Sequence, residues 1–432
     1  MKITVLVLGT RGDVQPFIAL AIALQRRGHE VCVATSRGFA DMVAHSGARY
    51  VPVSADYEEW FQSEEGIRWM AGSDNTAKFM RMLAGEGVGI DSRLKPRMHR
   101  ELLAACEGAD AIIANLVIED CAACIAEKLK VPLIPGYTMP MLPTSEFPSP
   151  FLSAHKLPLR AMNRLTHSLL ETLYWQGQKR LINAWRAELG LPPTAISMRE
   201  KLWRAGAPIL HCYSSQLVPR PSDWSAANVI TGPWTMPPDV RVNAGGVPSP
   251  ELIRWLDEGP PPIYLGYWRL PSMDKAGMLR LAIEVSKTLG VRFAIGASWS
   301  EEEIAALRVP ESIFITRSVD HDWLFARCSA TVHHGGAGTT AATLRAGLPT
   351  VICSICNDQP FWGNRVTALG VGYSMSFKQL TAERLTQALR HIQDGAVRAR
   401  ANRLGELMRQ EDGTATAVRI IEERLPGAPL LS

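Results

Sequence analysis

The segment from Cys328 to Val371 constrains the fold more than any other part of the chain. Ala330–His333 is short, apolar and rich in β-branched residues, which is typical of a buried strand. The following HHGGAGTT, ending at Thr340, is a glycine-rich turn that opens a helix, and Gly347 and Pro349 end that helix. A strand, a tight turn, a helix and a second strand in this order predict a parallel α/β sheet.

The same turn predicts an anion site. Glycines let the backbone approach a ligand closely, the first N–H groups of a helix lack intrahelical partners, and the helix dipole favours negative charge. A diphosphate fits such a site, and His333 at the strand end can donate to a phosphate oxygen. The glycines alone are equally compatible with a turn that only closes the chain. Asp358 and Gln359, about 20 residues later, add a second polar turn, although Asp358 alone fits a helix N-cap before Pro360.

The N-terminal half shows the same alternation of strands and helices. Ile3–Leu8 is a near-continuous apolar strand, and Gln15–Arg27 is an amphipathic helix. Ligands of doubly wound sheets bind beyond the carboxyl ends of the strands, so the intervening turn with Arg11, Gly12 and Asp13 is a candidate site. The alternative for Asp13 is a structural role as the cap of the helix that follows.

Length and composition predict a protein of two domains. They indicate neither a nucleic-acid partner nor a membrane-spanning segment. A chain of 432 residues exceeds one ordinary core, and the Pro/Gly-rich segment 232–250 is the expected linker between domains 1–231 and 251–410. A net charge of +4 is too small to indicate nucleic acid. No apolar run is long enough to span a membrane, and the first strand follows Met1 directly, so we expect a cytoplasmic protein.

The eight cysteines include two CxxC pairs, Cys121/Cys124 and Cys353/Cys356. Zinc sites use such pairs, but these two lie far apart in sequence, one in a predicted helix and the other at a strand end. We interpret them as small buried thiols and expect no metal.

Four sequence motifs together resemble those of one enzyme family. They are GTRGDVQPFIALA from Gly9, HHGGAGTT from His333, LRAGLPT from Leu344 and DQPFWGNRV from Asp358. They resemble nucleotide-sugar glycosyltransferases of the GT-B fold, in the branch with sterol glucosyltransferases and glycopeptide-antibiotic glycosyltransferases. The resemblance implies two facing Rossmann-like domains with a deep cleft. The first would bind the acceptor and the second the nucleotide sugar, and segment 411–432 would form a helix that packs back on the first.

The resemblance also implies roles for individual residues. The diphosphate would be held by His333, Gly336, Ala337, Gly338 and Thr339, the sugar hydroxyls by Asp358 and Gln359, and the nucleobase by the backbone of Ser318 and Val319. Asp13 would be the general base, and Arg11, Gly12 and Arg269 are candidate phosphate contacts. An aspartate with its ordinary pKa near 3.9 is a weak base unless burial raises that pKa.

The expected reaction is inverting transfer of a hexose, with glucose as the first expectation. The donor would be a UDP- or dTDP-sugar, and the acceptor a hydroxyl of an apolar small molecule such as a sterol, polyketide, phenol or lipid. Neither a cofactor nor a metal is expected, because the helix N-terminus and His333 would carry the diphosphate charge. Without a transmembrane segment, peripheral membrane contact stays open.

Two alternatives differ in kind. A nucleotide-sugar epimerase would need acid and base groups on both faces of the sugar, and a second such group has no candidate. The other alternative is a non-catalytic binding or auxiliary protein. It is favoured by the bulky Tyr267-Trp268-Arg269, which stands where the family has a small turn. The chain also has Asp320 where the family has a proline before His321. The intact motif residues oppose this alternative.

Overall fold

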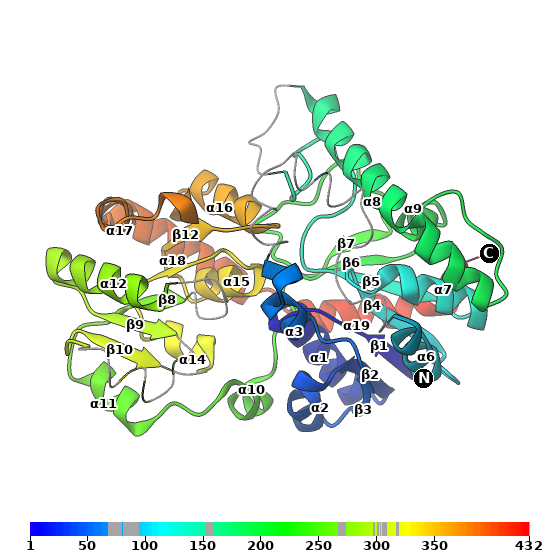
Figure 1. The fold of residues 1–432 in the computed structure, drawn as a ribbon, viewed down its shortest axis with the longest axis horizontal. Coiled ribbons are helices and arrows are strands. Elements are labelled where there is room, and N and C mark those ends of the chain that lie inside the picture. Colours follow the sequence, from blue (N-terminus) through cyan, green and yellow to red (C-terminus); the bar gives the residue numbers. More distant parts are fainter. Residues whose placement is uncertain are drawn as a thin grey trace. The chain divides into compact units, whose positions relative to one another are not determined.

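The structure is a computed structural model that describes residues 1–67, 80, 95–152, 159–266, 274–296, 299, 302, 304, 309–316 and 319–431. It divides into two compact units (Figure 1). The N-terminal unit consists of Met1–Val240 together with Glu411–Ser432, and the C-terminal unit consists of Arg241–Gln410. The first unit is therefore built from both ends of the chain.

The N-terminal unit is a parallel sheet covered by helices. Its strand order within the described residues is β3-β2-β1-β4-β5-β6-β7. The strands are β1 (Lys2–Leu6), β2 (Glu30–Ser36), β3 (Arg49–Val53), β4 (Ala111–Asn115), β5 (Leu133–Tyr137), β6 (Ile209–His211) and β7 (Asn228–Ile230). The described helices are α1 (Arg11–Arg26), α2 (Ala40–Ser46), α3 (Tyr57–Gln62), α6 (Lys95–Ala105), α7 (Glu119–Leu129), α8 (Arg160–Glu188), α9 (Met198–Arg204) and α19 (Gly413–Arg424), with short 3-10 turns at Arg37–Phe39 and Leu425–Gly427.

The C-terminal unit repeats this architecture with the order β10-β9-β8-β11-β12-β13. Its strands are β8 (Ile263–Gly266), β9 (Phe293–Gly296), β10 (Ile313–Thr316), β11 (Ala330–His333), β12 (Thr350–Ser354) and β13 (Gly372–Ser376). Among the described residues, its helices are α11 (Pro250–Asp257), α12 (Lys275–Leu289), α14 (His321–Phe325), α15 (Ala337–Arg345), α16 (Gln359–Ala368), α17 (Ala382–Ile392) and α18 (Gly395–Arg409), with a 3-10 turn at Phe377–Gln379.

All strand pairs in both sheets are parallel, so the carboxyl ends of neighbouring strands lie at one edge. In the C-terminal sheet, His333 at the end of β11 pairs with Gly266 at the end of β8 and with Ile352 of β12. The turns that follow these strands therefore meet at a common edge, and the predicted α/β class is confirmed. Near-continuous apolar strands suit this arrangement because helices bury both faces of the sheet.

One helix boundary differs from the predictions. Helix α1 begins at Arg11, four residues before the expected Gln15, because Thr10 and Asp13 form a capping box at its start. The predicted linker, segment 232–250, contains the short helix α10 (Pro238–Gly245), which begins with a proline, as is typical of a first helical position.

Helix α19 packs on α1 in the N-terminal unit (Figure 1). Glu422 accepts hydrogen bonds from Arg27, at 3.0 Å, and from His29, at 3.1 Å. Glu411, just before α19, accepts from the backbone N–H and the hydroxyl of Ser215. These contacts hold the last helix on the first unit.

A buried ion pair joins α7 to α8. Arg186 donates two hydrogen bonds of 2.8 Å to the carboxylate of Glu127, and their side chains are 1% and 5% exposed. Lys201 of α9 donates to the same carboxylate at 2.9 Å. Burial alone would raise the pKa of Glu127, but the hydrogen bonds from Arg186 and Lys201 outweigh it and hold that pKa below its usual value.

Replacing Glu127 by glutamine should destabilise the fold by about 3 kcal/mol, because it leaves the buried Arg186 charge uncompensated. Chemical denaturation monitored by circular dichroism measures this free energy. The matched control is Glu423→Gln, which breaks an exposed pair with Arg419 on α19 and should cost no more than about 0.5 kcal/mol. Equal losses for the two variants would contradict the prediction.

The same variant should show a pH dependence. A carboxyl whose pKa is lowered by folding stabilises the fold above its ordinary pKa and loses this contribution as pH falls through the lowered pKa. The difference in stability between wild type and Glu127→Gln should therefore shrink in acid.

Candidate functional site

The end of β11 places a buried histidine beside a glycine turn. His333 is 0% exposed, and its Nδ1 accepts a hydrogen bond of 3.0 Å from the backbone N–H of Gly335. A neutral imidazole carries one proton, so this proton is on Nε2. Among the described residues, the buried Nε2 has no hydrogen-bond partner. Buried polar groups in native proteins are nearly always paired, so this N–H is available to an acceptor from a ligand.

The environment keeps His333 neutral. Burial lowers the pKa of His333 well below its usual value, and the nearby imidazoles of His334 and His321 lower it further. A neutral N–H donor at this point can bind a phosphate oxygen without first taking up a proton.

Helix α15 begins directly after this turn, and its N-terminus is open. Its N-cap residue is Gly336, which has no side chain to cap the helix, and its first turn contains no acidic residue. Gly338 in that first turn is exposed. The first N–H groups of a helix have no intrahelical acceptor, so those of Ala337, Gly338 and Thr339 are free of intrahelical bonds and suit an anion.

Gly335 shapes the turn that connects His333 to α15. Its φ of +94° lies in the left-handed region, which favours glycine. An added Cβ would also lie 2.6 Å from Cγ2 of Ile352 and 3.2 Å from the backbone oxygen of Gln359. The turn after β11 therefore packs directly against the start of α16, which brings the two polar turns predicted from the sequence together.

Asp358 and Gln359 make different contacts within the second turn. Asp358 occupies the N-cap position of α16 without a capping hydrogen bond, and its Oδ2 accepts from the indole Nε1 of Trp362 at 2.7 Å. Oε1 of the buried Gln359 accepts from the backbone N–H groups of Ile355 and Cys356, at 2.8 and 3.2 Å. The carbonyl group of Gln359 thus holds the turn, while Asp358 is partly exposed.

Two predicted contacts, Ser318 and Arg269, lie outside the described residues. So does the Tyr267-Trp268 pair, which departs from the family's small turn. Val319 is described; it is partly buried and packs against the apolar cluster that contains Leu324 and Phe325.

His321 belongs to the same neighbourhood and was not predicted as a site residue. Its Nε2 lies 3.2 Å from the hydroxyl of Tyr264, and its ring stacks on Phe325 with centroids 4.6 Å apart. It is close enough to His333 to lower the pKa of that residue. Its position just beyond the carboxyl end of β10 was the available sequence signal.

Asp13 lies in the corresponding turn of the N-terminal unit, after β1. Its Oδ2 accepts from the backbone N–H of Thr10 at 2.8 Å and from the Thr10 hydroxyl at 3.0 Å, which closes the capping box. Its Oδ1 accepts no hydrogen bond from the described part of the chain. Burial raises the pKa of Asp13, and the two bonds from Thr10 oppose this rise. Asp13 therefore does have the structural role of capping α1, and this role uses only one of its carboxylate oxygens.

The neighbours of Asp13 support this geometry. Gly9 has a φ of +129°, and an added Cβ would lie 2.5 Å from Oδ2 of Asp13, so no larger residue fits there. Arg11 donates to Oε1 of Gln15 at 2.9 Å, and Gly12 is exposed.

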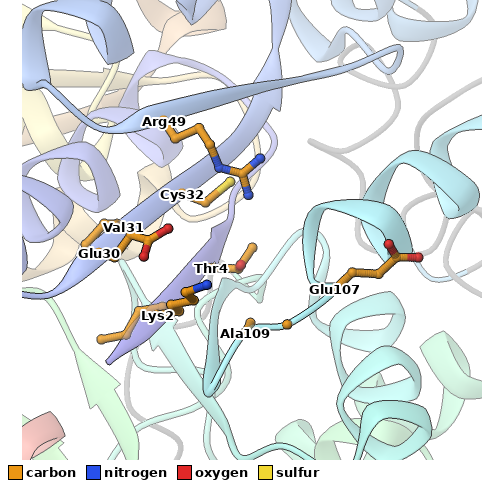
Figure 2. Close-up of a pocket in the computed structure, with 10 residues that line it drawn as sticks. Lys2, Thr4, Glu30, Val31, Cys32, Arg49, Glu107 and Ala109 are labelled. Carbon is orange, nitrogen blue, oxygen red and sulfur yellow. The ribbon is translucent and has the colours of Figure 1, made fainter.

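A small hollow at the opposite edge of the N-terminal sheet is lined by ionic side chains (Figure 2). Lys2, Glu30 and Arg49 stand at the amino ends of β1, β2 and β3, and Glu107 lies before β4. Its volume of about 90 Å³ is well below the roughly 300 Å³ at which ligand pockets begin. Both its size and its position away from the carboxyl edge argue against a substrate site.

Three further observations concern metals, thiols and membranes. Among the described residues, no group of three or more His, Cys, Asp or Glu side chains is arranged to hold a metal ion. All eight cysteines are free and buried, as predicted for the two CxxC pairs. No helix in the described ranges combines the length and hydropathy needed to cross a bilayer.

Two domain families match the chain. The glycosyltransferase family 28 N-terminal domain matches residues 3–148, which include Asp13. The C-terminal domain of the erythromycin biosynthesis protein CIII-like family matches residues 297–423, which include His333 and Asp358.

Curated relatives match nearly the whole chain. Two sterol 3-beta-glucosyltransferases of Arabidopsis thaliana are 35% and 33% identical over 99% of this chain and over 66% and 68% of their own lengths. A UDP-sugar-dependent glycosyltransferase of Dictyostelium discoideum is 31% identical over 99% of this chain and 26% of its own length. The chain thus spans about two thirds of the plant relatives and about a quarter of the amoebal one.

Solved structures share the fold. The glycotransferase of kitacinnamycin has a TM-score of 0.70 and 20% identity, with 98% of this chain and 99% of that chain covered. The glycosyltransferase VinC in complex with dTDP has a TM-score of 0.66 and 18% identity, with 99% and 100% covered. This likeness confirms the predicted GT-B fold of two Rossmann-like domains. The curated plant relatives, at 35% and 33% identity, show that the chain belongs to the sterol glucosyltransferase family.

Proposed function

We propose that the protein transfers glucose from UDP-glucose to the hydroxyl group of a sterol or sterol-like acceptor, with inversion at the anomeric carbon. The observation that carries the proposal is the buried N–H of His333, which has no partner among the described residues and lies beside the open N-terminus of α15. A diphosphate leaving group supplies the acceptor that this donor lacks, and it complements the helix dipole.

The relatives support the choice of substrates. The plant relatives are described as sterol 3-beta-glucosyltransferases, and the amoebal relative as UDP-sugar-dependent. The related structure of VinC contains dTDP, so a dTDP-hexose is the competing donor.

The diphosphate would be bound by His333 and by the first turn of α15, from Gly336 to Thr339. Nε2–H of His333 and the first N–H groups of α15 would stabilise the negative charge that develops as the bond to the sugar breaks. Asp358, held by Trp362 through Oδ2, would accept from sugar hydroxyls, and Gln359 would contribute through the turn that its side chain fixes. Ser318, Val319 and Arg269 are proposed nucleotide contacts. This arrangement needs no metal or cofactor.

Asp13 is the proposed general base. As the acceptor oxygen attacks the anomeric carbon from the face opposite the diphosphate, its proton would pass to Oδ1 of Asp13, while the bond from the sugar to the diphosphate breaks. Oδ2 would keep its bonds to Thr10, so that the carboxylate stays oriented. The rise in the pKa of Asp13 through burial makes it a stronger base than an exposed aspartate. Arg11 and Gly12 line the same turn.

Donor binding can be measured by calorimetric titration with UDP-glucose and dTDP-glucose separately. His333→Ala should weaken binding of the preferred donor by about tenfold or more, since it removes a buried hydrogen bond to a charged group.

Asp358→Ala should weaken binding of the nucleotide sugar but not of UDP or dTDP alone. Binding of neither donor by the wild-type protein would contradict the proposed function.

The pH dependence of donor binding tests the state of His333. Because burial lowers its pKa, the imidazole stays neutral down to well below pH 6.5, and the affinity for UDP-glucose should show no transition near that pH. A loss of affinity above pH 6.5 would indicate a protonated imidazole and contradict this assignment.

Asp13→Asn should lower kcat by about 10²- to 10⁴-fold, because an amide cannot take the proton, while donor affinity stays unchanged. The carboxamide oxygen can still accept from Thr10, so the start of α1 is kept. The control is Asp56→Asn, the same change at an aspartate whose Oδ1 caps α3. Full turnover in Asp13→Asn would rule out Asp13 as the base.

A further inference from the structure

Four charged side chains of the C-terminal unit form one cluster, here called the ion cluster: Arg241, Asp320, Asp322 and Arg345. Nε of Arg241 donates to Oδ2 of Asp320 at 2.5 Å, and Nη1 of Arg241 donates to Oδ2 of Asp322. Arg345 donates to Oδ1 of Asp322. The cluster joins α10, the start of α14 and the last turn of α15.

Its geometry is more constrained than that of a surface ion pair. The four side chains are between 7% and 21% exposed, and their two positive and two negative charges balance. Each oxygen of Asp322 is bound by an arginine from a different helix. Arg241 bridges two carboxylates at once, a geometry that suits the planar guanidinium and not the single ammonium of lysine.

The cluster also fixes the first turn of α14. Oδ1 of Asp320 accepts from the backbone N–H of Asp322 at 2.9 Å and so caps this helix. The preceding residue is Val319, a proposed nucleobase contact. A shift of this segment relative to α15 would break the bond between Asp322 and Arg345.

Helix α15 connects the cluster to the proposed diphosphate site. Its N-terminus is that site, and Arg345 lies at its other end, about 12 Å away at 1.5 Å per residue. The backbone oxygen of Arg345 also accepts a hydrogen bond of 2.7 Å from Nη1 of Arg409, at the end of α18. The helix is therefore held at its C-terminal end from two directions.

We propose that Arg241, Asp322 and Arg345 are positioning residues that set the spacing between the nucleobase segment at Val319 and the diphosphate site at the start of α15. This inference rests on the proposed function of the C-terminal unit. A nucleoside diphosphate must reach both points, so a fixed spacing preorganises the site for the whole nucleotide. Inorganic pyrophosphate reaches only the helix N-terminus, so its binding does not depend on the spacing.

The test compares three probes, UDP, dTDP and inorganic pyrophosphate, by calorimetric titration of the full chain. Arg241→Gln and Asp322→Asn should each weaken binding of the preferred nucleoside diphosphate by about tenfold, the size of effect expected for residues that couple two segments. Binding of pyrophosphate should stay at the wild-type value. Arg241→Lys should show a partial loss, because one ammonium cannot hold both carboxylates in the same geometry.

The matched control is Arg26→Gln, which breaks an exposed pair with Asp239, with side chains 56% and 66% exposed. It should leave the affinity for all three probes unchanged. If the cluster variants lower thermal stability but bind the nucleotide as tightly as wild type, or if they lose nucleotide and pyrophosphate affinity equally, the positioning role is wrong. A wild-type protein that binds neither UDP nor dTDP would instead overturn the proposed function itself.

Discussion

The hydrogen bond from the Gly335 N–H to Nδ1 of His333 is the interaction on which the candidate donor site depends. It fixes the tautomer and thereby turns Nε2 into a donor that the described protein does not use. Parallel pairing of β11 with β8 and β12 brings this donor to the edge where the other turns lie, and burial keeps it uncharged. This turn requires a left-handed φ at position 335, which glycine adopts readily.

Asp13 illustrates how one side chain serves structure and proposed chemistry together. Oδ2 closes the capping box with Thr10, while Oδ1 accepts no hydrogen bond from the described residues and is the proposed proton acceptor. A side chain that is locked by local hydrogen bonds needs no reorganisation when it takes a proton. The capping interpretation and the catalytic hypothesis are therefore compatible.

Local signals predicted the fold well. The apolar strands, the glycine turn after His333 and the motif at Asp358 predicted the parallel sheets and the family, because strand periodicity and turn chemistry act over a few residues. The predicted start of α1 at Gln15 was wrong, although the spacing of Thr10 and Asp13 is that of a capping box and indicated an earlier start. The ion cluster could not be predicted from the sequence, because Arg241 and Asp320 are 79 positions apart and only the fold brings them together. The roles assigned to individual site residues stay predictions.

The N-terminal unit has a consequence for synthesis on the ribosome. It is discontinuous in sequence, because α19 comes from residues 413–424, after the whole C-terminal unit. Helix α19 contacts α1, and its Val418 and Ile421 are buried, so the first unit lacks these packing contacts until the final segment emerges. Domains usually fold in the order in which they are made. Here the second unit can be complete before the first, which leaves the surface of α1 that contacts α19 uncovered while about 170 residues are translated.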